Sequence, residues 1–454
     1  MSTPALVALA AAGVALLLFL VIVVRLHAFV ALLVTSLVVA VAGGVPLERI
    51  AAEVQQQMGG TLGYIAVVIG LGAMFGEMLR RSGGAERVAR GLISAFGERA
   101  SPWALAATGL IVAIPVFFDV ALILLVPLVY SLAQRSGRSL LYYAIPLLAG
   151  IAVGHSFIPP TPRPVAVAGL LGADLGWVIL IGLAAGVPAT LVGGLWFGRR
   201  VARRIQLEVP EFARDGAQDG AQEEVALPGA RRPSFGLVVG LIALPLLLIL
   251  LGTVSASWLP EEHALRRGLA FAGHPFTALI VATLLAFRWL GTRLGFSREE
   301  VREMAGKSLE PVGMIILVTG GGGVFGKVLV STGVGEAVAQ GMADSRLPLV
   351  LLAFLLAAVV RVAQGSATVS MVTAAALVAP IVEAGAPSPP QVAAVVIAIA
   401  CGATVLSHVN DSGFWLVSRF LGMSERQTLG VWTVMETVVG VTGLLVVLAL
   451  SLLL

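Results

Sequence analysis

Apolar stretches near the length of a membrane-crossing helix recur along the whole chain. A helix needs about 20 apolar residues to cross the hydrocarbon core of a bilayer. Stretches near this length occupy residues 5–24, 28–43, 237–251, 270–289 and 433–454. The pattern therefore predicts an all-α polytopic membrane protein that is embedded in a lipid bilayer.

A second pattern is a repeat at an offset of 250 residues. The segment that begins at Pro46 aligns without gaps with the segment that begins at Phe296. The aligned pairs are Gly63 with Gly313, Phe75–Gly76 with Phe325–Gly326, Glu86 with Glu336, and Gly91 with Gly341. We therefore expect a first repeat over residues 1–198 and a second over residues 234–454, joined by a hydrophilic linker over residues 199–233.

Each half contains the same order of predicted elements. A pair of short apolar segments, at about 102–134 and 347–383, is expected to enter and leave the membrane on one side as a re-entrant hairpin. A helix interrupted by polar residues follows, at about 139–172 and 390–421. We count about five spans per half, and this odd number predicts two inverted repeats, a common transporter plan.

The positions of basic residues predict the orientation. Cytoplasmic loops are enriched in Arg and Lys, so we expect the linker to be cytoplasmic and both termini periplasmic. The residues that then lie inside are Arg25, Arg80, Arg81, Arg135, Arg138, Arg199, Arg200, Arg203, Arg204, Arg288, Arg293, Arg298, Arg302, Lys307, Arg419 and Arg426. The N-terminus lacks the basic region of a secretory signal, so we expect it to be retained as the first span.

Composition agrees with this interpretation. The chain is 58% hydrophobic and only 12% charged, whereas soluble domains carry about a quarter charged residues. The formal charge of +4 comes from Arg at span ends and does not indicate a nucleic-acid partner. The lone Cys401 excludes an intrachain disulfide framework.

Four polar interruptions, two per half, carry the candidate chemistry. In the first half Asp119 lies at the turn of the short pair, and "GHSFIPPTPRP" contains His155, Ser156 and Thr161. In the second half "RVAQGSATVS" and "SHVNDSGFW" occupy the corresponding places. Prolines prevent a continuous helix, and a broken helix at membrane depth must be buried in protein or line a wet cavity.

Broken helices offer positive helix ends and free backbone amides, which suit an anion. Hydroxyl and amide side chains suit a polyol, so the combination predicts a small hydroxylated carboxylate as substrate. The candidate substrate-binding residues are Gln364, Ser366, Thr368, His408, Asn410, Ser412, Thr161 and Arg361. The candidates for proton coupling are Asp119, Asp411 and His155, because a carboxylate in a low-dielectric cavity can have its pKa raised towards the working pH.

Each candidate also has a structural interpretation. Asp119 can form a salt bridge, Arg361 can lie at the lipid interface, and His155 and His408 can be structural hydrogen bonders. Asp411 can cap the helix that follows it instead of carrying a proton. We expect no metal and no cofactor, because no HExxH motif or Cys cluster accompanies these histidines.

At these motifs the sequence resembles the gluconate permease family, which are gluconate:proton symporters within the ion transporter superfamily. The residues that carry the resemblance are 114–130, 154–177, 361–370 and 407–415. The resemblance implies uptake of gluconate or a related sugar acid with protons across the bacterial inner membrane. It also implies a homodimer with an elevator-like motion. One departure is Arg163, where family members commonly have a small residue.

The leading hypothesis is a proton-coupled sugar-acid symporter. Sodium coupling is an alternative, because carbonyl groups at broken helices also suit Na+. An intramembrane enzyme that uses Asp119 and Asp411, and a passive channel, are further alternatives. The sequence leaves open whether the substrate is gluconate, another aldonate, glycerate or a hydroxylated amino acid such as D-serine.

Overall fold

Every regular element in the described part of the chain is a helix. The structure is a computed structural model that describes residues 3–211, 213, 232–332 and 348–454. Within these residues, nine helices are long and apolar enough to cross a membrane by length and composition. This confirms the predicted all-α polytopic class. The predicted linker over 199–233 falls largely outside the described residues.

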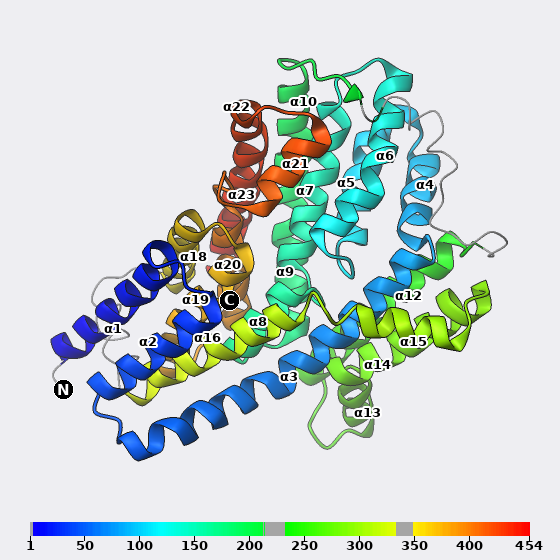
Figure 1. Cartoon of the computed structure of the whole chain (residues 1–454). Coiled ribbons are helices and arrows are strands. Elements are labelled where there is room, and N and C mark those ends of the chain that lie inside the picture. The colour runs from blue at the N-terminus through cyan, green and yellow to red at the C-terminus, as the bar shows by residue number, and fades with distance from the viewer. Residues whose placement is uncertain (1–2, 212, 214–231, 333–347) are drawn as a thin grey trace.

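The first half contributes the helices labelled α1 to α10 (Figure 1). They are α1 Thr3–Leu18, extended by a π-helical turn Phe19–Val23, α2 Ala28–Ala42, α3 Leu47–Arg81, α4 Gly84–Phe96, α5 Ser101–Val112, α6 Phe118–Ser136, α7 Leu141–Phe157, α8 Pro162–Leu171, α9 Leu175–Thr190 and α10 Phe197–Ala202. A π-helical segment, Leu191–Trp196, joins α9 to α10 without a break.

The second half contributes α12 to α23. The helices are α12 Phe235–Trp258, α13 Ala264–Ala272, α14 Pro275–Ala286, α15 Arg298–Lys307, α16 Gly313–Ser331, α18 Leu349–Gln364, α19 Ala367–Gly385, α20 Pro389–Thr404, α21 Ser412–Leu421, α22 Glu425–Thr428 and α23 Val434–Ser451. A π-helical turn, Leu429–Thr433, connects α22 to α23.

The helix boundaries differ from the apolar stretches in two places. The apolar stretch at 270–289 is not one helix, because α13 ends at Ala272 and α14 begins at Pro275. Proline favours the first position of a helix, and His274 caps this one by accepting from the backbone N–H of Phe276 at 3.3 Å. The second arms of the two short pairs, α6 and α19, are 19 residues each. They end at Ser136 and Gly385, slightly beyond the expected ends at about 134 and 383.

The aligned regions of the two halves differ in one respect. Helix α3 runs without interruption for 35 residues, whereas α15 and α16 are separate helices. Pro311 lies in the gap between them, at the position aligned with Thr61, and proline disrupts a helix interior. Phe75 and Phe325 are both fully buried, but Glu336 and Gly341 lie outside the described residues. The inverted repeat therefore stays a prediction.

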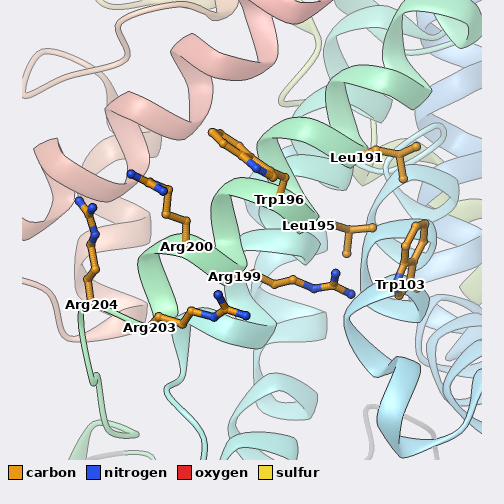
Figure 2. A pocket seen from close by; sticks show the side chains of 8 residues that line it. All are labelled: Trp103, Leu191, Leu195, Trp196, Arg199, Arg200, Arg203 and Arg204. Atoms are coloured by element: carbon orange, nitrogen blue, oxygen red, sulfur yellow. The ribbon is translucent and has the colours of Figure 1, made fainter.

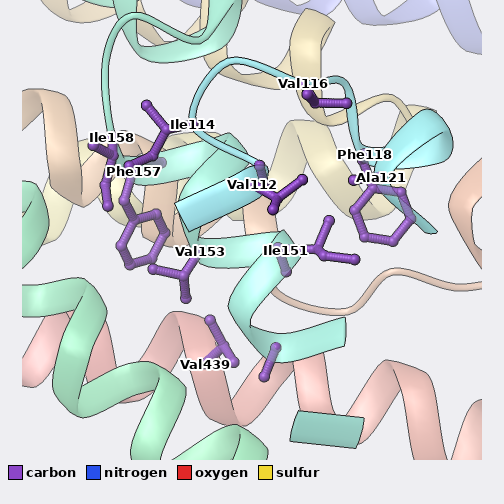
Figure 3. Close-up of a cluster of buried hydrophobic side chains, with 14 of the residues drawn as sticks. Val112, Ile114, Val116, Phe118, Ala121, Ile151, Val153, Phe157, Ile158 and Val439 are labelled. Atoms are coloured by element: carbon purple, nitrogen blue, oxygen red, sulfur yellow. The ribbon is translucent and has the colours of Figure 1, made fainter. Parts of the chain in front are cut away.

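The broken helix of the first half is enclosed by protein. Over Leu141–Leu171, 94% of the residues in the most apolar window are buried, against 39% for Phe235–Trp258. Glycines at α5 and α7 allow close backbone approach, since a Cβ on Gly109 would meet the backbone of Leu147. Figure 3 shows the apolar cluster beside the break, which includes Val112, Ile114, Ile151, Phe157 and Val439. This enclosure is what irregular backbone at membrane depth requires.

Candidate functional site

The break between α20 and α21 forms hydrogen bonds with the last helix of the chain and the turn before it. Residues 405–411 are not helical, and Leu406 has a left-handed φ of 53°. The backbone N–H of Leu406 donates to the Thr437 hydroxyl at 3.1 Å. Trp432 Nε1 donates to the Ser407 hydroxyl at 2.7 Å, and the Thr433 hydroxyl donates to the Ser407 carbonyl. The π-helical turn Leu429–Thr433 and the start of α23 therefore supply hydrogen-bond partners that lipid could not.

Arg361 and Asp411 form an ion pair at the centre of this region. Arg361 is 3% exposed, at the end of α18, and its Nη2 atom contacts the Asp411 carboxylate. A second guanidinium nitrogen donates to the carbonyl of Gly365. The Arg361 Nε atom is buried and has no hydrogen-bond partner among the residues that the structure describes. Arg361 thus lies inside the protein and not at the lipid interface, and it keeps one donor free.

Asp411 has two further contacts. Its carboxylate accepts from the Ser407 hydroxyl and from the backbone N–H of Gly413, the latter at 3.0 Å. Asp411 is therefore the N-cap of α21 as well as the partner of Arg361. The capping role expected as one alternative is present in the structure, together with an ion pair that the sequence did not predict.

The tip between α18 and α19 rests against the same break. His408 Nε2 lies 3.1 Å from the carbonyl oxygen of Val362, and Asn410 Nδ2 donates to that oxygen at 2.9 Å. Gly365 has a φ of 85°, and a Cβ there would collide with the carbonyl of Asn410. Hydrogen bonds and close backbone packing therefore hold the tip directly against the broken helix.

Replacing Gly365 with alanine is expected to separate the tip from the break. The added methyl group would collide with backbone, and the left-handed φ strains any residue with a Cβ. We expect the free energy of unfolding to fall by about 2–4 kcal/mol, within the range of severe point mutants. Thermal unfolding in detergent measures this. Gly385→Ala is the control, because it has open space and no positive φ; equal melting temperatures for the two variants would contradict the contact.

The first half places a similar break beside its own short pair. Helix α7 ends at Phe157 and α8 begins at Pro162, and the Thr161 hydroxyl donates to the Ile158 carbonyl at 2.6 Å. Helix α3 lies against both features, since a Cβ on Gly76 would collide with the Pro115 carbonyl in the α5–α6 turn. Thr161 is buried and holds the break in shape.

His155 and Asp119 lie in different surroundings. His155 is 3% exposed, and its Nδ1 atom has no hydrogen-bond partner in the described ranges. Its ring centre is 5.9 Å from that of Phe117 at the α5–α6 turn. Asp119 is exposed, in the first turn of α6. Among the described residues it forms no ion pair within 4.0 Å. The salt-bridge alternative for Asp119 is therefore not observed.

Arg163 connects the two halves. Its Nε atom donates to the Thr368 hydroxyl of α19 at 3.2 Å, and its Nη1 atom lies 3.5 Å from the Ser156 hydroxyl of α7. Its charge also interacts with those of Arg361 and Asp411. The sequence singled out Arg163 only as a departure from the family pattern and did not predict this contact.

Glu436 is a buried acid that the sequence analysis missed. It is 5% exposed, and its Oε1 atom has no hydrogen-bond partner within the described part of the chain. It lies on α23 between Thr433 and Thr437, both of which contact the α20–α21 break. Its charge interacts with those of Arg361, Asp411 and Arg163. The available signal was a single acid inside the apolar stretch 433–454, since ionisable groups in spans are rare and functional by default.

The comparison with protein families decides the assignment. The model of the GntP family permease matches residues 5–453. The chain belongs to this family. It is 43% identical to the low-affinity gluconate transporter of Escherichia coli K12, over 98% of both chains. It is 38% identical to the gluconate permease of Pseudomonas aeruginosa PAO1, over 95% of this chain and 94% of that protein.

The fold is shared with a solved transporter of low sequence identity. MtrF of Neisseria gonorrhoeae, described as one of a class of antimetabolite efflux pumps, superposes with a TM-score of 0.66 at 13% identity, over 92% of this chain and 93% of that one. Since the GntP family consists of permeases, the chain is a multi-pass membrane transporter and not an enzyme. The predicted intramembrane-enzyme alternative is thereby removed.

The remaining candidates of the GntP site lie around the α18–α19 tip. Ser366 is the N-cap of α19 and accepts from the backbone N–H of Val369 at 3.4 Å. Gln364 is half-buried at the end of α18, and Ser412 is exposed at the start of α21. No group of three or more His, Cys, Asp or Glu side chains suited to a metal occurs in the described ranges. The second-half candidates thus gather at one place, and Asp119 of the first half acts electrostatically on Arg163.

Proposed function

We propose that the chain transports gluconate or a closely related sugar acid together with protons across the bacterial inner membrane. The two relatives named above are a gluconate transporter and a gluconate permease. The structural observation that carries the proposal is the buried Arg361, which has a free Nε donor beside two broken helices. A guanidinium with a free donor is suited to a carboxylate.

In this proposal the substrate carboxylate binds between Arg361 and Arg163. Arg163 reaches the α18–α19 tip from the other half through Thr368, so both cations lie at this tip. Hydroxyl groups of the sugar acid are expected to contact the polar side chains that surround the tip. These are Gln364, Ser366, Thr368, His408, Asn410, Ser412 and, from the first break, Thr161.

The balance of charges supports coupling to protons through Glu436. Arg163 and Arg361 provide two positive charges, and Asp411 and Glu436 provide two negative charges when both are ionised. Asp119 also acts on Arg163, but it is exposed and water screens its charge. With Asp119 screened, an ionised site is neutral and has no net attraction for an anion. Protonation of Glu436 leaves one uncompensated positive charge, which a substrate carboxylate neutralises. Proton and substrate therefore favour each other's binding, and this coupling is necessarily reciprocal.

Glu436 is favoured over the other acids because of its contacts. Asp411 already has Arg361, a hydroxyl and a backbone N–H as partners, whereas Glu436 Oε1 has no hydrogen-bond partner among the described residues. Asp119 is exposed and is proposed to exchange protons with water. His155, buried with a free Nδ1 atom, is proposed to relay protons between Asp119 and Glu436. Asp411 stays an alternative proton carrier, and the variants Glu436→Gln and Asp411→Asn distinguish the two acids.

The movement in this proposal follows from the hairpins and breaks. We propose that the pairs α5–α6 and α18–α19 are re-entrant and that the two halves are inverted repeats, with both termini periplasmic. The family resemblance further suggests a homodimer with an elevator-like motion. Cysteine accessibility at each terminus in whole cells tests the orientation: labelling from the periplasm is expected, and labelling only after lysis would contradict it.

Uptake into proteoliposomes tests the proposal. We expect labelled gluconate to accumulate when the lumen is alkaline relative to the outside, and to accumulate no further when sodium replaces choline at fixed pH. Accumulation that follows the sodium gradient and ignores the proton gradient would favour the sodium-coupled alternative. Counterflow that does not accelerate with gluconate in the lumen would favour a passive channel.

A further inference from the structure

A basic pocket lies at the end of α10, away from the breaks. It has a volume of about 490 Å³ and is lined by Trp103, Leu191, Leu195, Trp196, Arg199, Arg200, Arg203 and Arg204. In Figure 2 the Arg199 side chain extends from α10 toward Trp103 of α5, while Arg200 and Arg204 extend to the other side of α10. All four arginines are exposed. None of them forms an ion pair or a side-chain hydrogen bond with any residue that the structure describes.

The positive-inside rule alone does not account for this arrangement. That rule explains basic residues near a span end, but not a cluster of four that lines one pocket. Arg199 lies in the last turn of α10 and Arg203 is its C-cap residue, so their like charges lie close together at the pocket and repel each other. An anion in the pocket would relieve this repulsion.

The walls of the pocket indicate a ligand that reaches it from the lipid. Trp103 and Trp196 are 42% and 60% exposed, and Leu191 is 37% exposed. Tryptophans with exposed rings are typical of the level of the lipid headgroups. The side of the membrane is the one that the sequence predicts to be cytoplasmic. Basic pockets between spans on that side are suited to anionic headgroups.

We propose that the pocket binds the headgroup of an anionic phospholipid. The guanidinium groups of Arg199 and Arg203 would hold the phosphate, because Arg donates in pairs to phosphate oxygens. Trp103 and Leu191 would contact the glycerol and the first part of the acyl chains. This site is separate from the proposed substrate site and does not depend on the transported substrate.

Native mass spectrometry of the full chain tests the proposal, with phosphatidylglycerol and phosphatidylcholine as probes. We expect phosphatidylglycerol to remain bound to the wild type, and to bind about 30-fold more weakly in Arg199→Gln/Arg203→Gln, since this variant removes two basic residues that attract the anionic headgroup. The control is Arg288→Gln/Arg298→Gln, which removes two exposed arginines on the same predicted side. Arg199→Lys/Arg203→Lys keeps the charges and is expected to retain most of the binding.

Three results would overturn the assignment. Equal loss of phosphatidylglycerol in the Arg199→Gln/Arg203→Gln variant and in the control would show general attraction to basic loops. Equal retention of phosphatidylcholine by the wild type would show that charge is not recognised. Protection from thermal unfolding by inorganic phosphate, as strong as that by phosphatidylglycerol, would identify a soluble anion as the ligand.

Discussion

Arg361→Gln is expected to abolish gluconate binding and uptake. The variant removes the buried guanidinium whose Nε is proposed to meet the substrate carboxylate. Hydrogen bonds to charged groups contribute about 1.5–3 kcal/mol each, so the loss of the one free Nε donor in this buried site weakens binding by up to about 100-fold. Isothermal titration with gluconate in detergent measures the affinity, and proteoliposome uptake measures the transport.

Loss of stability has to be separated from loss of binding. Arg361→Gln leaves Asp411 without its ion partner, and breaking a buried pair costs about 3–5 kcal/mol. The double variant Arg361→Gln/Asp411→Asn removes both charges, so we expect it to recover most of the stability but none of the affinity. Arg419→Gln, at an exposed position, should bind as the wild type does. Wild-type affinity in the double variant would contradict the role of Arg361.

Glu436→Gln is expected to retain gluconate exchange across the membrane and to lose the proton-driven accumulation of gluconate. Glutamine resembles the protonated carboxyl group, so the site keeps its net positive charge at every pH. We expect gluconate counterflow to persist and to lose its pH dependence. Accumulation driven by a proton gradient should fall to a ratio of about one, because no proton is carried with the substrate. Counterflow and gradient-driven uptake in one preparation of proteoliposomes give both quantities.

A matched acid supplies the control for this variant. Glu383→Gln removes a half-exposed carboxylate that pairs with Lys327 at 2.7 Å, and it should accumulate gluconate as the wild type does. If Glu436→Gln still accumulates gluconate, the proposed carrier is wrong. Asp411→Asn then becomes the informative variant, because it removes the other acid that interacts with Arg361.

The class of fold could be predicted from apolar length alone, but helix boundaries could not. Hydropathy does not distinguish one helix from two at 270–289, where a single proline after Gly273 divides the stretch. It also underestimated α6 and α19, since their last turns are polar and continue until a left-handed residue ends them, Gly137 and Ala386. Helices end where backbone conformation changes and not where hydrophobicity does.

The polar interruptions in the sequence located the candidate site, but they did not predict the contacts within it. The sequence located both breaks and the residues of the α18–α19 tip, because prolines and polar runs inside a span require an irregular backbone that protein or water must enclose. It could not pair Arg361 with Asp411, since the two are 50 residues apart and only folding brings them together. Glu436 was missed because one acid barely lowers the apolar character of a span.

Proton movement that accompanies gluconate entry tests the central claim most directly. Proteoliposomes that contain a trapped pH-sensitive dye start with equal pH on both sides, and gluconate is then added outside. The account predicts that the lumen acidifies as gluconate enters, and that Arg361→Gln abolishes both signals. Gluconate entry by the wild type without any change in lumenal pH would contradict it.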